Sequence, residues 1–265
     1  MASQSPELNR ATIRLLVIPC IVYAVWLLEI FLLGGNPHIF ERFDPLALFL
    51  FTLIACILTG IVMPLFCIRT AFISGAVNMF QIGFRTFRRT ISVCFLTGII
   101  SYAAGIFLNP FGADRSAFAA AFLLLLPGAV ASVMICWVLV GTHVQAFVRG
   151  AGVAASVLVG IMVTALLFGM TSLAYFPAAG QDIFFLSVFV GVVTAVFFFA
   201  VRDVYAASIV AGVCSVFIFG DRISPVYLHN GFVYIGIYAV LAVGILMGIH
   251  LYLFRNYITL ELPPK

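Results

Sequence analysis

Few side chains in this sequence could do acid–base or metal chemistry, and those that could are far apart. Glu29 and His250 each lie within a long apolar run, and His143 lies at the inner end of another. Glu29 could carry a proton or bind a cation, or it could be a carboxylate at the membrane interface. The two histidines have no carboxylate near them in the sequence, and no H-E-x-x-H motif, carboxylate pair or Gly-rich phosphate loop is present. The sequence therefore predicts no metal site and no cofactor.

A second group of charges could bind anionic lipid headgroups. On a helix over residues 70–90, an apolar stripe would face a polar one. The apolar stripe is Phe72, Ala76, Phe80, Phe84 and Phe87, and the polar one is Asn78, Gln81, Arg85, Arg88 and Arg89. This pattern predicts an interfacial amphipathic helix whose Arg85, Arg88 and Arg89 either anchor the topology or bind headgroups.

The elements that would hold these residues are transmembrane helices. Of the 265 residues, 65% are hydrophobic and 8% are charged, whereas soluble domains carry about 25% charged residues. Eight continuous apolar runs are long enough to cross a bilayer. They are Ala11–Gly34, Leu46–Ile68, Ile91–Leu108, Ser116–Val140, Ala151–Phe176, Ile183–Val201, Val204–Phe219 and Gly231–Phe254. We expect one all-α, polytopic membrane domain over residues 1–265, with the first run retained as a span.

Charge placement predicts the orientation of these spans. With the N-terminus inside, the inner segments hold ten basic residues and the outer loops hold three. The inner ones are Arg10, Arg14, Arg69, Arg85, Arg88, Arg89, Arg149, Arg202, Arg255 and Lys265, and the outer ones are Arg42, Arg115 and Arg222. The positive-inside rule then places both termini in the cytoplasm of a plasma-membrane protein.

Small residues at a spacing of four mark close helix contacts. Gly152, Ser156 and Gly160 form one such series, and Ala207, Ala211 and Ser215 form another. In lipid, such faces let helices approach closely. We expect packing seams inside the bundle or at the interface of a homo-oligomer.

The stretch from Met79 to Ser215 resembles the CAAX-protease and bacteriocin-processing (CPBP, or Abi) family of intramembrane proteins. That family has about eight helices and three motifs, E-E-x-x-x-R, F-x-x-x-H and H-x-x-x-N. The matching segments here are 81–89, with a glycine and a basic run before a new helix, 144–150, 167–172 and 207–215. Arg149 and Phe168 keep the motif residues.

The residues that would do the family's chemistry are replaced. Val144 and Gln145 stand where the resemblance places the two glutamates, and Ser172 stands at the first histidine. Ala211 and Ser215 stand at the last histidine and the asparagine. Activation of a water nucleophile needs a general base, which these side chains do not supply. The resemblance implies a non-catalytic scaffold that binds a hydrophobic peptide, a lipid or a membrane partner, and it predicts that Gln145, Ser172 and Ala211 converge on one cavity.

Two other functions remain open from the sequence. One is a small transporter or channel that could form oligomers through the small-residue seams, and in it Glu29 would carry the proton or ion. The other is an enzyme that acts on lipids with His143 and Arg149. Membrane lipids are the expected partners in each case, together with a membrane protein or a second copy of the chain, and no nucleic acid is expected.

Overall fold

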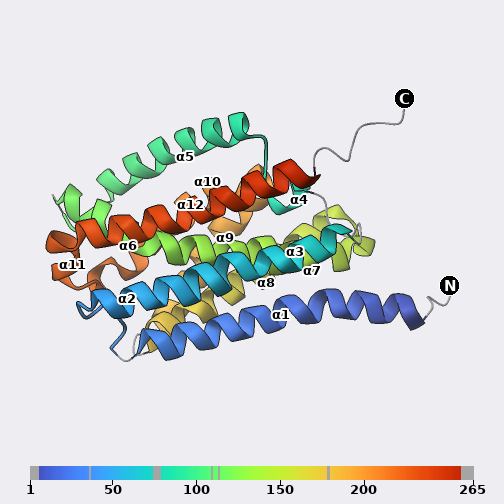
Figure 1. The fold of residues 1–265 in the computed structure, drawn as a ribbon, viewed down its shortest axis with the longest axis horizontal. Helices are drawn as coiled ribbons and strands as arrows, with labels where there is room; N and C mark the ends of the chain where they lie inside the picture. The colour runs from blue at the N-terminus through green and yellow to red at the C-terminus, as the bar shows by residue number, and fades with distance from the viewer. Residues whose placement is uncertain are drawn as a thin grey trace.

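The chain folds into an elongated bundle of helices. The computed structural model describes residues 6–35, 37–73, 79–108, 110–112, 114–177 and 180–257, and this part contains no strand. Figure 1 shows long helices lying side by side, with the N- and C-terminal ends at the same end of the bundle. The α-helices are α1 (Pro6–Gly34), α2 (Pro45–Phe51), α3 (Met63–Ile73), α4 (Met79–Ile82), α5 (Phe87–Phe107), α6 (Arg115–Ser132), α7 (Thr142–Val148), α8 (Val153–Tyr175), α9 (Gly180–Val201), α10 (Val204–Phe219), α11 (Pro225–Asn230) and α12 (Phe232–Tyr257). Between them lie the π-helical segments η1 (Thr52–Val62) and η2 (Val133–Gly141) and the 3₁₀ turns η3 (Arg149–Ala151) and η5 (Gly220–Arg222).

The predicted all-α membrane bundle is confirmed. The described part contains eight helices that are long and apolar enough to cross a bilayer. Three of these spans are composite: α2, η1 and the first part of α3 form Pro45–Arg69, α6, η2, α7 and η3 form Arg115–Ala151, and α10 and η5 form Val204–Arg222. The protein is therefore described below as a multi-pass membrane protein.

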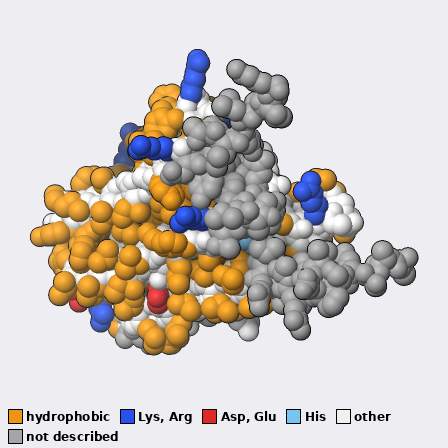
Figure 2. All heavy atoms as spheres, turned by 45° about the vertical axis from the view of Figure 1, so that its right-hand side comes forward, with side chains coloured by type: hydrophobic (Ala, Val, Ile, Leu, Met, Phe, Trp, Pro, Cys, Tyr) orange, Lys and Arg blue, Asp and Glu red, His pale blue; other side chains and the backbone are white. Residues whose placement is uncertain are grey.

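The span that contains η2 is the centre of the bundle. In an apolar stretch of 18 residues within this span, 83% of the residues are buried, compared with 22% in the span formed by α5. Every residue from Val133 to Val140 is buried, and Trp137 is fully enclosed. The outer helices instead expose large apolar side chains, which Figure 2 shows covering much of the described flank. Lipid is as apolar as these side chains, so their exposure costs little in a membrane.

Three aspartates define where helices begin. Asp44, Asp114 and Asp203 precede α2, α6 and α10, and the side chain of each accepts a hydrogen bond from a backbone amide three residues later, at 2.9, 2.9 and 3.0 Å. Each bond satisfies an amide that has no partner within its helix. These caps fix the junctions between spans and, at Asp203, the position of the residue before it.

The small-residue seams lie inside the bundle, as predicted. Ser156 and Gly160 are buried on α8, and Ala207, Ala211 and Ser215 are buried on α10. Gly160 packs against the side chains of Gln145 and Phe199. Gly152 is the exception, because it is exposed and lies before α8 with φ +102°.

The single amphipathic helix predicted over residues 70–90 is wrong. In the described part, α3 ends at Ile73, α4 covers only Met79–Ile82, and α5 begins at Phe87. Gly83 has φ +85°, which glycine adopts readily, and its carbonyl accepts a hydrogen bond from the Val204 amide at 3.1 Å. Phe84 is buried against His250 instead of facing lipid. Ala76 and Asn78, and the side chains of Phe72 and Phe80, lie outside the described residues.

Candidate functional site

The link between α9 and α10 has an unusual backbone. It consists of Arg202 and Asp203, and Arg202 has φ +55°, the one positive φ of a non-glycine residue in the described part of the chain. Such a conformation costs of the order of 1 kcal/mol and persists only where surrounding contacts impose it. Here the Arg202 amide donates to the Phe198 carbonyl at 2.7 Å, and the Val204 amide donates to the Gly83 carbonyl at 3.1 Å. The turn therefore holds the Arg202 side chain in a defined direction.

The guanidinium of Arg202 is oriented by two glutamines and an aromatic ring. It donates to the backbone oxygen of Gln81 at 2.8 Å and to the side-chain oxygen of Gln145 at 2.8 Å. It also lies 4.9 Å from the ring centroid of Phe199, within cation–π range. Burial, and secondarily the charge of Arg85, lower the pKa of Arg202, but a guanidinium remains protonated at neutral pH. The result is a half-buried, fixed positive charge.

A polar recess opens beside this guanidinium. It contains about 730 Å³ of empty space, part of it open solvent. Its lining residues come from α4, α7, η3, α8 and the α9–α10 link: Gln81, Thr142, Gln145, Ala146, Arg149, Val153, Ser156, Val157 and Arg202. We call it the arginine recess. The side-chain nitrogen of Gln145 is buried and has no hydrogen-bond partner among the described residues. Two guanidiniums and a spare amide donor, with no carboxylate in the lining, suit an anionic ligand.

The three arginines predicted to bind headgroups do not form one surface. Arg85 is partly buried, and its Nε donates to the backbone oxygen of Arg202 at 3.2 Å, so it supports the turn. Arg88 and Arg89 are exposed in the first turn of α5. Their binding of headgroups stays a prediction.

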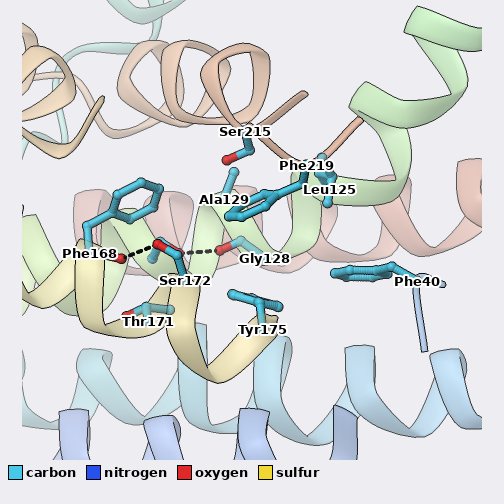
Figure 3. A pocket seen from close by; sticks show the side chains of 11 residues that line it. Phe40, Leu125, Gly128, Ala129, Phe168, Thr171, Ser172, Tyr175, Ser215 and Phe219 are labelled. Atoms are coloured by element: carbon cyan, nitrogen blue, oxygen red, sulfur yellow. Dashed lines mark hydrogen bonds between the residues drawn. The ribbon is translucent and has the colours of Figure 1, made fainter. Parts of the chain in front are cut away.

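A second cavity lies within the bundle, and most of its lining residues are buried (Figure 3). We call it the hydroxyl cavity, because Ser132, Thr171, Ser172, Tyr175 and Ser215 contribute to its lining. The remaining lining residues are Phe40, Leu125, Gly128, Ala129, Phe168 and Phe219. Figure 3 shows Ser172 and Ser215 on facing helices, α8 and α10.

The motif positions of the family resemblance are divided between these two sites. Gln145 and Arg149 line the arginine recess, whereas Phe168, Ser172 and Ser215 line the hydroxyl cavity. Val144 is partly buried and Ala211 fully buried, and neither lines either site. Ser172 lies 19 residues into α8, which corresponds to about 28 Å from the end of that helix at the recess. The expected convergence of Gln145, Ser172 and Ala211 on one cavity is therefore not seen.

The ionisable residues within the spans have separate surroundings. Glu29 is half-buried, and its Oε2 is buried without a hydrogen-bond partner in the described part. His143 contacts the carbonyl of Leu139 through Nδ1 at 2.6 Å. His250 Nε2 lies 2.8 Å from the carbonyl of Arg85, so this nitrogen carries the hydrogen. In the described residues, no group of three or more His, Cys, Asp and Glu side chains could hold a metal ion.

Three residues of these sites were missed by sequence reasoning. Arg202 was counted only as an inner charge, although its place in a two-residue link signalled a constrained turn. His38 and Tyr175 lie in an aromatic cluster beside the hydroxyl cavity, with ring centroids 5.5 Å apart. Nothing in their local sequence indicated that they meet.

Comparison with known proteins finds no match to a family model, to a curated protein or to a solved structure. The CPBP resemblance stays a prediction from sequence segments.

Proposed function

We propose that the protein is a non-catalytic membrane protein that binds an anionic amphiphile, either a lipid or a lipid-modified peptide, with its charged headgroup in the arginine recess. The observation that carries the proposal is the oriented guanidinium of Arg202. Its backbone turn, two glutamine oxygens and the Phe199 ring fix it before any ligand arrives. Binding to a pre-oriented charge loses less side-chain entropy than binding to a flexible one.

The position of the recess supports a ligand that comes from the bilayer. It lies where several apolar spans end, and its lining includes Val153 and Val157 beside the polar groups. A headgroup could reach the arginines while its acyl chain stays against the apolar flank. Arg149 is exposed at the rim and can follow the ligand.

The absence of a general base supports binding over catalysis. Neither the arginine recess nor the hydroxyl cavity has an Asp, Glu, His or Cys among its described lining residues. Serine and threonine hydroxyls need such a neighbour to become effective nucleophiles. The CPBP scaffold is a hypothesis from the sequence alone, and the separation of Gln145 from Ser172 counts against it.

The same proposal assigns an orientation. Arg85, Arg88, Arg89, Arg149, Arg202 and Arg255 lie at the end of the bundle that carries the termini, and Arg42, Arg115 and Arg222 lie at the other (Figure 1). By the positive-inside rule, we place the recess at the cytoplasmic face of a plasma membrane.

Replacing Arg202 with glutamine is expected to weaken binding of phosphatidic acid by about tenfold or more, because the charge-assisted hydrogen bond from the guanidinium to the phosphate is lost. The measurement is titration of the purified protein, in phosphatidylcholine nanodiscs, with a fluorescent phosphatidic acid. Arg115→Gln makes the same charge change at the opposite end and should leave the affinity unchanged. Equal losses in both variants would show a general charge effect and contradict the assigned site.

A small transporter is the second candidate, and the buried Oε2 of Glu29 favours it. An acceptor atom without a donor inside a span can take a hydrogen bond or a cation from a passing ligand. Glu29→Gln is then expected to abolish proton- or cation-coupled flux in proteoliposomes, while Glu41→Gln, outside the spans, should preserve it. Absence of flux through the unsubstituted protein for every ion tested would remove this candidate.

A further inference from the structure

The hydroxyl cavity contains an unused hydrogen-bond donor. The Tyr175 ring is buried, and its hydroxyl has no hydrogen-bond partner among the described residues. This hydroxyl lies over Gly128, where even a methyl group would crowd it. A buried polar atom without a partner costs free energy, so this hydroxyl indicates a bound molecule that accepts its hydrogen bond.

The other hydroxyls around the cavity can accept hydrogen bonds. Ser132 donates to Gly128, Thr171 to Leu167, and Ser172 to Phe168, at 2.8–2.9 Å. Their hydrogens are used within their own helices, and their oxygens keep lone pairs for another donor. The cavity thus offers one donor and several acceptors, which matches a small neutral molecule that both donates and accepts. The cavity has room for about one water molecule.

A loop between α1 and α2 closes this cavity at the end of the bundle opposite the termini. His38, Ile39 and Phe40 are buried, and Phe40 reaches the cavity beside the Tyr175 ring, with centroids 5.9 Å apart (Figure 3). The loop is held by bonds from the Ser224 amide to the Phe40 carbonyl at 2.8 Å and from the Asp44 amide to the Tyr227 hydroxyl at 3.1 Å. We call residues 37–44 the plug.

His38 is the group in the plug that can respond to pH. It is 2% exposed, and rings of Phe40, Phe51, Tyr175 and Phe176 surround it at 4.7–5.6 Å between centroids. Its Nε2 is buried without a hydrogen-bond partner in the described part. We call these four rings the aromatic box. The titratable and charged groups around it are Arg42 on the plug itself, Tyr175 on α8, and Arg222, which lies 5.9 Å from the Phe176 ring.

These surroundings oppose a positive charge on the imidazole. Burial, and then the charge of Arg42, lower the pKa of His38 to about 3, from an ordinary value of about 6.5. Between about pH 3 and pH 6.5, His38 therefore binds fewer protons when the plug is closed than when it is open. Closure is fully favoured above about pH 6.5 and is weakened as the pH falls below it.

We propose that residues 37–44 form a proton-operated plug over a buried site for a small neutral hydrogen-bonding molecule, and that protonation of His38 connects this site to the water outside. The imidazolium leaves the aromatic box for water and takes Phe40 with it. Water then reaches Tyr175, Ser172 and Ser215. This inference does not depend on the ligand of the arginine recess.

Hydroxyl-radical footprinting tests the plug, with water itself as the probe. The full chain in nanodiscs is labelled at pH 7.5 and pH 5, and oxidation of Tyr175 and Phe40 is read by mass spectrometry. Between these values the population of the open state should rise by up to about 30-fold if the open plug titrates normally. Trp137, which is fully buried outside the cavity lining, reports global unfolding and should stay unlabelled.

Three variants make the result decisive. His38→Phe should keep Tyr175 protected at both pH values, and Phe40→Ala should leave it labelled at both. His229→Phe removes an exposed histidine at the same end and should keep the pH response. Labelling of Tyr175 that is the same at pH 7.5 and pH 5, or a pH response that survives His38→Phe, would overturn the proposal.

Discussion

Replacing Asp203 with alanine is expected to lower the free energy of unfolding by about 3 kcal/mol, since one buried carboxylate joins α10 to α5. Its Oδ1 caps α10 through the Ala206 amide, and its Oδ2 accepts from the Thr90 hydroxyl of α5 at 2.9 Å. The Cys94 thiol, also on α5, lies 3.9 Å from Oδ1. Alanine would leave the buried Thr90 hydroxyl and the helix amide without these acceptors. Thermal or denaturant unfolding in detergent measures the loss.

Asp114→Ala is the matched control for this change. Asp114 caps α6 through the Ala117 amide at 2.9 Å, but this bond is only partly buried and the bond from the Ser116 hydroxyl is exposed. Hydrogen bonds from the Ser116 hydroxyl and from the Ala117 amide lower the pKa of this carboxyl, and water can replace the carboxylate when it is removed. We expect a loss of about 1 kcal/mol there. Equal losses at the two aspartates would show that Asp203 acts only as a helix cap and does not hold α5.

Introducing a methyl group at Gly60 should be the second large perturbation. Gly60 lies in η1, where an added Cβ would overlap the Cβ of Ala131 in the central span. Ala131 is fully buried and has no rotamer through which to move away. Gly60→Ala should therefore destabilise the protein by about 2 kcal/mol, although alanine is the better helix former. The shift of the unfolding midpoint in detergent reports this.

A second substitution separates overlap from other effects of the new methyl group. Ala131→Gly in the Gly60→Ala background removes the opposing Cβ and should restore most of the lost stability. Gly98→Ala is the control, because no atom lies within 4 Å of the added Cβ, and it should be neutral or slightly stabilising. Failure of the double variant to recover would mean that overlap with the Ala131 Cβ is not the main cost of the added methyl group.

The spans were predictable from the sequence because their signal is local. A run of apolar residues must be helical in lipid, where no water satisfies the backbone, so length and composition are enough. The aspartates at positions 44, 114 and 203 could mark helix starts for the same reason, since a cap acts within four residues. The seams on α8 and α10 followed from spacing alone.

The candidate sites were not predictable because their contacts join distant segments. The bond from Arg202 to Gln145 spans 57 residues, and the bond from Arg202 to Gln81 spans 121. The break at Gly83 also depends on tertiary contacts, since its carbonyl pairs with the Val204 amide and Phe84 is drawn into the bundle. The sequence of residues 70–90 alone has a continuous amphipathic pattern, because the residues that break the helix, Val204 and His250, lie far away in the chain.

The adjacency of Arg202 and Asp203 has a consequence for communication across the membrane domain. The first residue points its guanidinium to the arginine recess, and the second points its carboxylate to α5. One peptide unit therefore connects the ligand-facing guanidinium to the carboxylate that holds α5. A displacement of either side chain rotates this shared peptide unit. If a bound anion restrains Arg202, it also restrains the hinge from which α5 is tethered, and by reciprocity a change in α5 alters the affinity for the anion. This two-residue link is thus the place where occupancy of a ligand and the mobility of a peripheral helix are thermodynamically coupled.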